Sequence, residues 1–309
     1  MAGVDGAAPP AAPLRWLEIA LDQRCNQRCL GCPATDSGPE LQAIQLVRAL
    51  EDGRRRGIRQ LWIGGGEPTL RRELPTLVRQ ARSRGYTRVK LQTNGAMLGY
   101  PELVERLADA GVTEVAVSLK GADAPTHDRL ARVDGAFEQL RRGLANVRAR
   151  ALPLEGDVLL YRSTTATLPA IVRRFFDEGV RRFRVWAMAP ARDDAAALAE
   201  EPRLAEVAAA VERTLDLALA DDPEHLVSLH SPPCTLRGRG ERARFLARKL
   251  GLLVHDPGGS PFRLEESPIE GGHFSPRCDG CSLRPRCGGV RGDYLARHGD
   301  GELAPQDDS

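Results

Sequence analysis

Apolar runs of strand length alternate with amphipathic segments of helix length over the first two thirds of the chain. The runs that predict strands are Leu17–Leu21, Ile58–Ile63, Arg88–Gln92, Val112–Leu119, Asp157–Tyr161 and Arg182–Met188. Helical patterns lie between them at about 40–56, 73–84, 101–110, 136–150 and 168–179, and glycine or proline marks most junctions. Six consecutive β-α units predict a parallel sheet with right-handed crossovers.

This order of elements fits either a doubly wound open sheet or a barrel, and periodicity does not decide between them. The chemically informative residues follow the first four predicted strands, at their C-terminal ends. Active sites of barrel enzymes gather at that end. We therefore expect an α/β fold with a partial (β/α)6 barrel, similar to a TIM barrel, over residues 15–220. Its last predicted helix covers about 203–220.

The character of the sequence changes near residue 221. Beyond this point proline and glycine become more frequent, apolar periodicity fades, and four of the seven cysteines occur. We expect a small cysteine-rich domain over 221–299. Residues 1–14 lack the basic and long apolar regions of a signal peptide, and they are predicted to be a disordered leader. Residues 300–309 are predicted to be a disordered tail.

Composition and charge narrow the function classes. The formal net charge is +2 with 28% charged residues, which gives no support for nucleic-acid binding. No apolar stretch is long enough to span a membrane. Cysteines without a secretory signal are typical of the reducing cytoplasm, where clustered cysteines are more often metal ligands than disulfides. We therefore expect a cytoplasmic protein whose cysteines bind metal.

The first candidate site is the loop after the first predicted strand. Cys25, Cys29 and Cys32 have the spacing C-x3-C-x2-C, which places three thiolates on one tight loop. Three ligands are one too few for a closed [4Fe–4S] cluster or a structural zinc site. An open coordination position would be a place where a substrate or cofactor binds. Taken alone, the spacing also fits unliganded buried cysteines or a zinc loop completed from elsewhere.

The second candidate site is the sequence GGGEPT at Gly64–Thr69, directly after the second predicted strand. Consecutive glycines let backbone groups approach a ligand closely, and the carboxylate of Glu67 could bind an ammonium group. Alone, this pattern is also typical of an ordinary strand-to-helix turn. Its position beside the cysteine loop, after the next strand, favours a binding site.

Together with LQTNG at Leu91–Gly95 and VSLKG at Val117–Gly121, these motifs resemble the radical S-adenosylmethionine (radical SAM) superfamily over residues 15–190. The resemblance implies a [4Fe–4S] cluster whose open position binds SAM. Reductive cleavage of SAM would give a 5′-deoxyadenosyl radical that abstracts a substrate hydrogen. The implied cluster ligands are Cys25, Cys29 and Cys32. The residues predicted to bind SAM, in these motifs or at neighbouring strand ends, are Gly65, Gly66, Glu67, Thr93, Asn94, Ser118, Arg162 and Met188.

One position departs from the family pattern. Relatives commonly have an aromatic residue before the third cysteine, where this chain has Gly31. The adenine of SAM must then be contacted elsewhere, and the end of the sixth strand at Met188 is a candidate.

Two residues at strand ends are candidates for catalysis. Lys120 has the same facing as Ser118, because side chains alternate along a strand, and it could anchor a substrate carboxylate or be a solvated lysine. Tyr161 ends the fifth strand and could contact SAM or substrate. His127, in the loop after the fourth strand, is predicted to be a surface or capping residue.

Four cysteines in the C-terminal part form a second set: Cys234, Cys278, Cys281 and Cys287. Four thiolates close the coordination of a [4Fe–4S] cluster or a zinc ion. With Gly289 and Tyr294 downstream, this segment resembles the SPASM and twitch extensions of radical SAM enzymes. That resemblance implies a second, auxiliary [4Fe–4S] cluster. If Cys234 is not a ligand, an open iron site that binds substrate becomes possible.

The resemblance implies two substrate classes. Relatives with such extensions often modify peptides by crosslinking, thioether formation or epimerisation, and this is the function we expect. The alternative is dehydrogenation or rearrangement of a small molecule in cofactor or natural-product biosynthesis, and a third reading is a zinc-binding interaction protein. Expected partners are a low-potential electron donor such as flavodoxin or ferredoxin and a separate leader-peptide-binding protein, since the first strand begins near residue 15.

Overall fold

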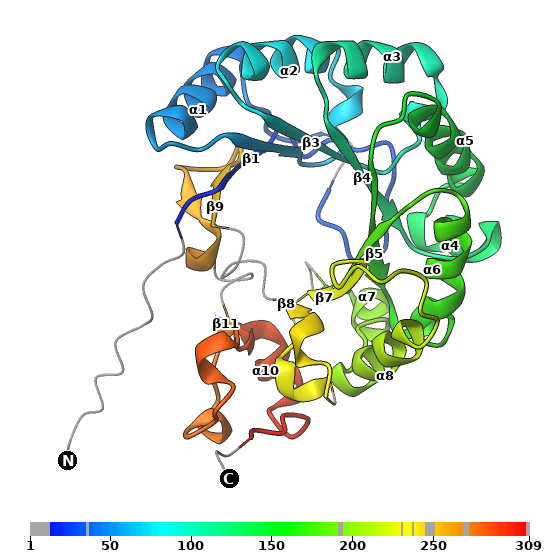
Figure 1. Cartoon of the computed structure of the whole chain (residues 1–309), viewed down its shortest axis with the longest axis vertical. Coiled ribbons are helices and arrows are strands. Elements are labelled where there is room, and N and C mark those ends of the chain that lie inside the picture. Colours follow the sequence, from blue (N-terminus) through cyan, green and yellow to red (C-terminus); the bar gives the residue numbers. More distant parts are fainter. Residues whose placement is uncertain are drawn as a thin grey trace.

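One curved sheet organises the molecule in this computed structural model, which describes residues 13–34, 37–190, 194–229, 231–236, 238–244, 251–267 and 272–306. The strand order is β10-β9-β1-β2-β3-β4-β5-β6-β7-β8. All neighbours from β9 to β8 are parallel, and β10 is antiparallel to β9. Figure 1 shows the helices on the outer face of this sheet, which curves around an open concave side. The predicted partial barrel is confirmed.

The sheet strands are β1 (Trp16–Ala20), β2 (Gln60–Gly64), β3 (Arg88–Thr93), β4 (Glu114–Leu119), β5 (Leu154–Leu160), β6 (Arg182–Ala187), β7 (Leu226–Leu229), β8 (Ala243–Arg244), β9 (Leu252–His255) and β10 (Phe262–Arg263). A separate hairpin pairs β11 (Gly272–His273) with β12 (Val290–Arg291). The helices are α1 (Ala43–Arg55), α2 (Leu74–Ser83), α3 (Pro101–Ala110), α4 (Ala124–Ala131), α5 (Ala136–Ala149), α6 (Leu168–Asp177), α7 (Ala195–Ala199), α8 (Leu204–Leu215) and α10 (Gly292–His298).

All six predicted strands and the predicted helices are present, with shifted ends. The fifth strand begins at Leu154 rather than Asp157, and the helix predicted over 203–220 ends at Leu215. Helices α4, α7 and α10 were not predicted from the sequence. A signal for α4 was available, because Asp123 is an N-cap whose carboxylate accepts a hydrogen bond from Thr126 N at 2.8 Å.

The domain boundary expected near residue 221 requires correction, because β7, β8 and β9 extend the core sheet beyond it. These strands are too short to stand out in the sequence, and β9 joins the opposite edge, beside β1. The expected disorder of the tail is also wrong for 300–306, since Leu303 is buried and Ser282 N donates to Gln306 O at 2.8 Å. Residues 1–12 and 307–309 lie outside the described residues.

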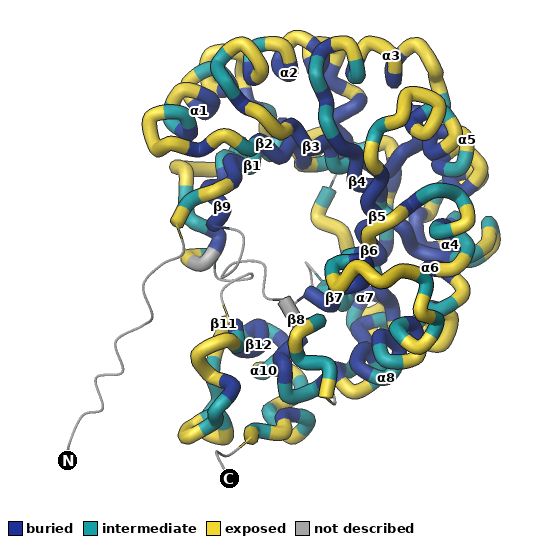
Figure 2. Tube along the Cα trace, viewed as in Figure 1, coloured by how far each residue is buried: buried dark blue, intermediate teal, exposed yellow. Residues whose placement is uncertain are grey.

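Side-chain alternation separates two apolar cores. The outward residues of the strands pack under the helices in one large cluster, while the inward residues of both sheet edges form a second cluster on the concave side. All three tryptophans of the chain pack in this second cluster, and Trp16 and Trp62 make an edge-to-face contact with ring centroids 6.3 Å apart. Figure 2 shows the strands as the buried layer and the helix surfaces as the exposed one.

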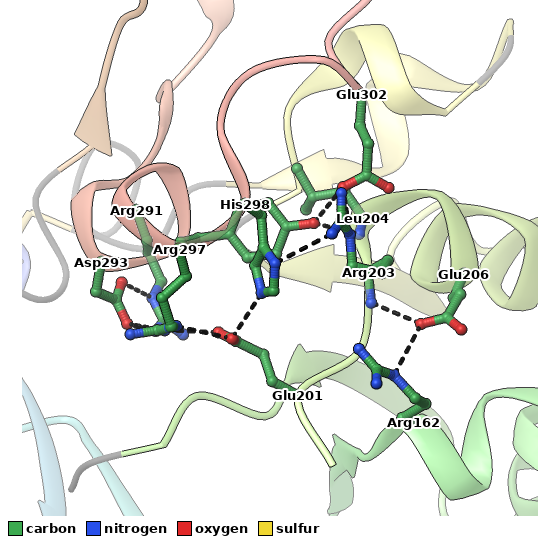
Figure 3. Close-up of polar contacts among 11 residues, drawn as sticks. Arg162, Glu201, Arg203, Leu204, Glu206, Arg291, Asp293, Arg297, His298 and Glu302 are labelled. Atoms are coloured by element: carbon green, nitrogen blue, oxygen red, sulfur yellow. Dashed lines mark hydrogen bonds and ion pairs between the residues drawn. The ribbon is translucent and has the colours of Figure 1, made fainter. Parts of the chain in front are cut away.

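Ion pairs attach the C-terminal segment to the core just before α8 (Figure 3). The carboxylate of Glu201, 2% exposed, accepts hydrogen bonds from Arg297 at 2.7 and 2.8 Å and lies 2.8 Å from His298 Nε2. Arg203 Nε donates to Glu302 at 3.0 Å. Because breaking one partner of a buried pair leaves an uncompensated charge, these contacts hold the segment in one position.

His127 is completely buried, so its predicted surface or capping role is wrong. Its ring packs against Phe137 of α5 with centroids 5.7 Å apart, and neither ring nitrogen has a hydrogen-bond partner within the described part of the chain. Burial, with a smaller effect of nearby Lys120, lowers the pKa of His127 to about 3. The imidazole is therefore neutral at pH 7 and behaves as a core residue.

His127→Leu should make the protein less sensitive to acid. The unfolded chain protonates His127 near pH 6.5 and the folded chain does not, so wild-type stability falls as pH drops from about 6.5 toward 3. The advantage of the variant over wild type should grow by about 2 kcal/mol between pH 7.5 and pH 5. Anaerobic urea denaturation at both pH values measures this difference, and an unchanged difference would contradict the burial of a neutral imidazole.

Candidate functional site

The loop after β1 carries the first cysteine set and is fixed from two sides. Backbone hydrogen bonds join it to the end of α4, including Leu30 N to Leu130 O at 2.9 Å. The hydroxyl of Tyr161 donates to Leu30 O at 3.0 Å. Gln27 N donates to Cys25 Sγ at 3.4 Å, as expected for a thiolate ligand. The three thiols on this braced loop are those of Cys25, Cys29 and Cys32.

Burial dominates the electrostatics of the first thiol on this loop. Together with smaller effects of Glu67, Cys29 and Cys32, and against the opposing Gln27 N–H, burial raises the pKa of Cys25 to about 11. A thiol in such surroundings loses its proton readily only when a cationic centre accepts the thiolate. Within the described residues, no three or more His, Cys, Asp or Glu side chains are arranged to hold a single metal ion. At this point, support for a cluster rests on the C-x3-C-x2-C spacing of this loop.

Gly65 and Gly66 are required by a close approach of two backbones. Gly66 N donates to Asp22 O and Glu67 N to Arg24 O, both at 2.7 Å. A Cβ atom on Gly66 would lie 2.0 Å from Arg24 O, and one on Gly65, whose φ is +114°, would lie 2.6 Å from Asp22 O. The carbonyls of these two glycines accept no protein hydrogen bond in the described ranges, so they suit an ammonium group.

The Glu67 carboxylate joins two loops rather than facing a cavity. It is 0% exposed and accepts hydrogen bonds from Thr69 N at 3.0 Å, Thr93 Oγ1 at 2.7 Å and Asn94 N at 2.7 Å. Burial raises its pKa, and these hydrogen bonds oppose the shift. The side-chain amide of Asn94 in turn lies 3.8 Å from Cys25 Sγ. The carboxylate has no surface on which to bind an ammonium group directly, so we assign it a positioning role.

Two other predicted site residues, Tyr161 and Arg162, have protein partners that draw them away from their predicted roles. Tyr161 is 0% exposed, and burial raises its pKa far above the ordinary value, so its predicted catalytic role is replaced by support of the cysteine loop. Arg162 turns toward α8, with Nε 3.6 Å from the carboxylate of Glu206 (Figure 3). The structure therefore does not bring Arg162 to the predicted SAM site.

Three predicted residues do lie beside the cysteine loop or on the concave side. Met188 is buried, and its Sδ would be 2.9 Å from a Cβ atom on Gly31, so the glycine makes room for the methionine. Ser118 is on the concave face of β4 and is partly exposed. Lys120 is 3% exposed, and its ammonium group has no hydrogen bond or ion pair among the described residues. It is a buried cation that could meet a carboxylate.

The sequence reading missed a polar layer on the concave face. Asp157 accepts hydrogen bonds from Gln92 Nε2 at 2.8 Å and Trp186 Nε1 at 3.3 Å. Burial raises the pKa of Asp157, and nearby Lys90 opposes the shift. Polar residues at alternate positions of β3 and β5, within otherwise apolar strands, were the available signal. Asp157 keeps further acceptor capacity and faces the concave side, where Ser118 is its neighbour in register.

The second cysteine set surrounds one small pocket whose other walls include Phe274, Leu283 and Val290. Burial raises the pKa of Cys287, and the other three thiols add to the shift, while the Gly289 N–H opposes it. Gly289 N donates to Cys287 Sγ at 3.2 Å, and Gln306 N donates to Cys281 Sγ at 3.4 Å. The thiols that line the pocket are Cys234, Cys278, Cys281 and Cys287.

A three-cysteine loop at the C-terminal rim of a partial parallel barrel defines a cofactor-dependent α/β enzyme. The family model described as "Radical SAM superfamily" matches residues 21–185, so the chain belongs to the radical SAM superfamily. The family implies a [4Fe–4S] cluster and SAM as cofactors, and the residues of the first site fit both. The recognition made from the sequence is confirmed. No helix of the described residues is long and apolar enough to cross a membrane.

Curated relatives differ in their reactions. The chain is 34% identical over 173 residues to a probable GTP 3′,8-cyclase of Methanopyrus kandleri, covering 54% of this chain and 55% of the relative. It is 32% identical over 231 residues to PqqA peptide cyclases of Xanthomonas campestris pv. campestris, covering 69% of this chain and 58% of the relative. The chain thus spans little more than half the length of these relatives.

Solved structures share the fold at low identity. The anSMEcpe structure with bound AdoMet and Cp18Cys peptide has a TM-score of 0.65 and 16% identity, covering 95% of this chain and 93% of that one. Streptococcus suis SuiB bound to precursor peptide SuiA has a TM-score of 0.65 and 16% identity, covering 82% of this chain and 60% of that one. The likeness to anSMEcpe includes the cysteine-rich C-terminal part.

Glu67→Gln should separate the loops of the first site. The new amide NH2 group would face N–H and O–H donors, so we expect a loss of about 1–3 kcal/mol in stability and weaker SAM binding. Glu105→Gln, at an exposed position on α3, is the matched control. Urea denaturation and calorimetric SAM titration of the anaerobic protein measure both effects. Equal behaviour of the two variants would exclude the positioning role.

Proposed function

We propose that this radical SAM enzyme modifies a peptide and carries an auxiliary [4Fe–4S] cluster in its C-terminal part. The observation that carries the proposal is the convergence of all four remaining cysteines on one pocket, separate from the three-cysteine loop. A closed set of four thiolates suits a cluster that is not required to bind SAM. The bound peptides of the anSMEcpe and SuiB structures, and the PqqA peptide cyclase relatives, support a peptide substrate.

The residues of the first site have separate tasks in this proposal. When bound, the cluster and SAM together supply a 5′-deoxyadenosyl radical. The carbonyls of Gly65 and Gly66 would hold the ammonium group of SAM, and Met188, which fills the space beside Gly31, would contact the adenine. Lys120 holds a carboxylate of SAM or substrate, and Ser118 contacts the SAM ribose or carboxylate.

The concave face of the sheet holds the substrate. Asp157 accepts a hydrogen bond from an N–H or O–H group of the substrate, and Gln92 and Trp186 keep its carboxylate in place. The apolar cluster below this layer excludes water from that end of the barrel. A low-potential carrier such as flavodoxin or ferredoxin supplies the electrons. A separate protein binds the leader peptide of the substrate. The reaction takes place in the cytoplasm.

A small-molecule dehydrogenase or rearrangement enzyme is the second candidate. The similarity to probable GTP 3′,8-cyclases favours it, because those relatives are named for a reaction of a nucleotide. Both candidates use the same first site and differ in what occupies the concave face.

Alanine replacement should affect SAM cleavage in the first cysteine set and iron content in the second. Replacing Cys25, Cys29 and Cys32 together should abolish formation of 5′-deoxyadenosine, because no loop thiolate remains for the SAM-binding cluster. Replacing Cys278 and Cys281 should remove about four iron per chain, since one cluster holds four, while SAM cleavage continues. Iron, sulfide and zinc analysis of anaerobically purified protein, with chromatography of the nucleoside product, measures both.

Each variant serves as the control for the other. Continued 5′-deoxyadenosine formation without the first set would refute the assignment of the SAM cluster. Zinc in place of iron in the wild-type C-terminal set, with an unchanged iron content in the Cys278 and Cys281 variant, would refute the auxiliary cluster.

A peptide encoded beside the gene should be altered by the enzyme. With SAM and dithionite, mass spectrometry should show a loss of hydrogen for a crosslink or thioether, or deuterium incorporation from D2O for epimerisation. The triple cysteine variant is the control. Turnover of a nucleotide or other small molecule, with no peptide altered, would instead favour the second candidate.

A further inference from the structure

The outer rim of the barrel carries an amphipathic groove that the proposed reaction does not use. The groove has a volume of about 550 Å3 and lies between the N-terminal ends of α2 and α3, which neighbour each other in Figure 1. Large hydrophobic side chains are exposed at three described positions, and Leu70 and Tyr100, exposed by 37% and 60%, both line this groove. Exposed apolar side chains that gather in one groove are typical of a protein-binding surface.

The charge of the groove selects an acidic partner. Arg71, Arg72 and Arg106 line it, together with the single carboxylate of Glu102. Arg71 is already paired with Glu73 and with two loop carboxylates. Arg72 and Arg106 are exposed and have no ion-pair partner within the described ranges. Their guanidinium groups are therefore available to carboxylates of another protein.

The groove also lies next to the first cysteine set. Thr69 lines the groove, and its backbone N donates to Glu67 at 3.0 Å. Asn94 N donates to the same carboxylate at 2.7 Å, and Asn94 Nδ2 lies 3.8 Å from Cys25 Sγ. A few hydrogen-bonded side chains thus separate the floor of the groove from a cluster ligand. A partner in the groove would be close to the cluster without entering the concave face.

We propose that this groove is the docking site of an acidic, low-potential electron carrier. This inference rests on the proposed function, which needs such a carrier. In each docking event the reduced carrier gives up one electron and the cluster held by the Cys25 loop accepts it, with no proton or group transferred. Electron-transfer complexes have small interfaces and depend on charge complementarity. Arg72 and Arg106 provide the positive charge, and Leu70 and Tyr100 provide apolar contact beside it.

Charge reversal in the groove tests the docking site by binding and by rate. The variant Arg72→Glu with Arg106→Glu is compared with Arg48→Glu with Arg79→Glu, two exposed arginines outside the groove that change the net charge equally. The affinity of oxidised flavodoxin for the anaerobic holoenzyme is measured by calorimetry. Formation of 5′-deoxyadenosine is then measured with flavodoxin, its reductase and NADPH, and separately with dithionite.

The groove variant should bind flavodoxin at least about tenfold more weakly at low salt, and flavodoxin-supported turnover should fall in parallel. Dithionite-supported turnover should be unchanged, because this small reductant needs no docking. Unchanged flavodoxin binding by the groove variant, or an equal loss in the control variant, would overturn the docking site. Failure of wild type to cleave SAM even with dithionite would refute the proposed function, while the binding measurement still decides the groove.

Discussion

The first site depends on one buried carboxylate. Glu67 accepts hydrogen bonds from its own turn and from the turn after β3, while its backbone N–H bonds to the loop after β1. Ends of three neighbouring strands are thereby joined at one point. Burying a carboxylate is costly unless donors surround it, and here they do. The glycines beside it allow this contact, because any side chain there would collide with the cysteine loop.

The concave face of the sheet consists of an apolar region and a polar region. Apolar side chains from both sheet edges pack in one cluster, and a layer of paired charges and hydrogen bonds lies on the strands between them. In that layer Lys90 pairs with Glu155, while the hydrogen-bond donors to Asp157 among the described residues, Gln92 and Trp186, are neutral. Asp157 is therefore the carboxylate of this layer that a substrate group can best complement. A parallel barrel provides this separation because alternate residues of each strand face opposite sides.

The sequence predicted what depends on local spacing and missed what depends on distant packing. The two motifs after β1 and β2 act through short loops, so their spacing indicated both the family and the site. Spacing did not reveal that Thr93 and Asn94 enclose Glu67, because these two residues belong to another strand end. Tyr161 was predicted at a strand end facing SAM or substrate, and His127 in a surface loop. The packing of α4 and its neighbours buries both side chains. The pairing of β9 with β1 is likewise long-range.

The same packing sets the relation between the two cysteine sets. Tyr161 braces the first cysteine loop, and the next residue, Arg162, donates its backbone N–H to Glu200 O at 2.8 Å. Glu201, the residue after Glu200, accepts two hydrogen bonds from Arg297 of α10. One short segment before α8 is therefore hydrogen-bonded to the support of the first cysteine loop and to the helix that follows the second cysteine set. These contacts hold the two cysteine sets in one relative position, and the auxiliary cluster proposed above would need such a fixed position to exchange electrons with the first cluster.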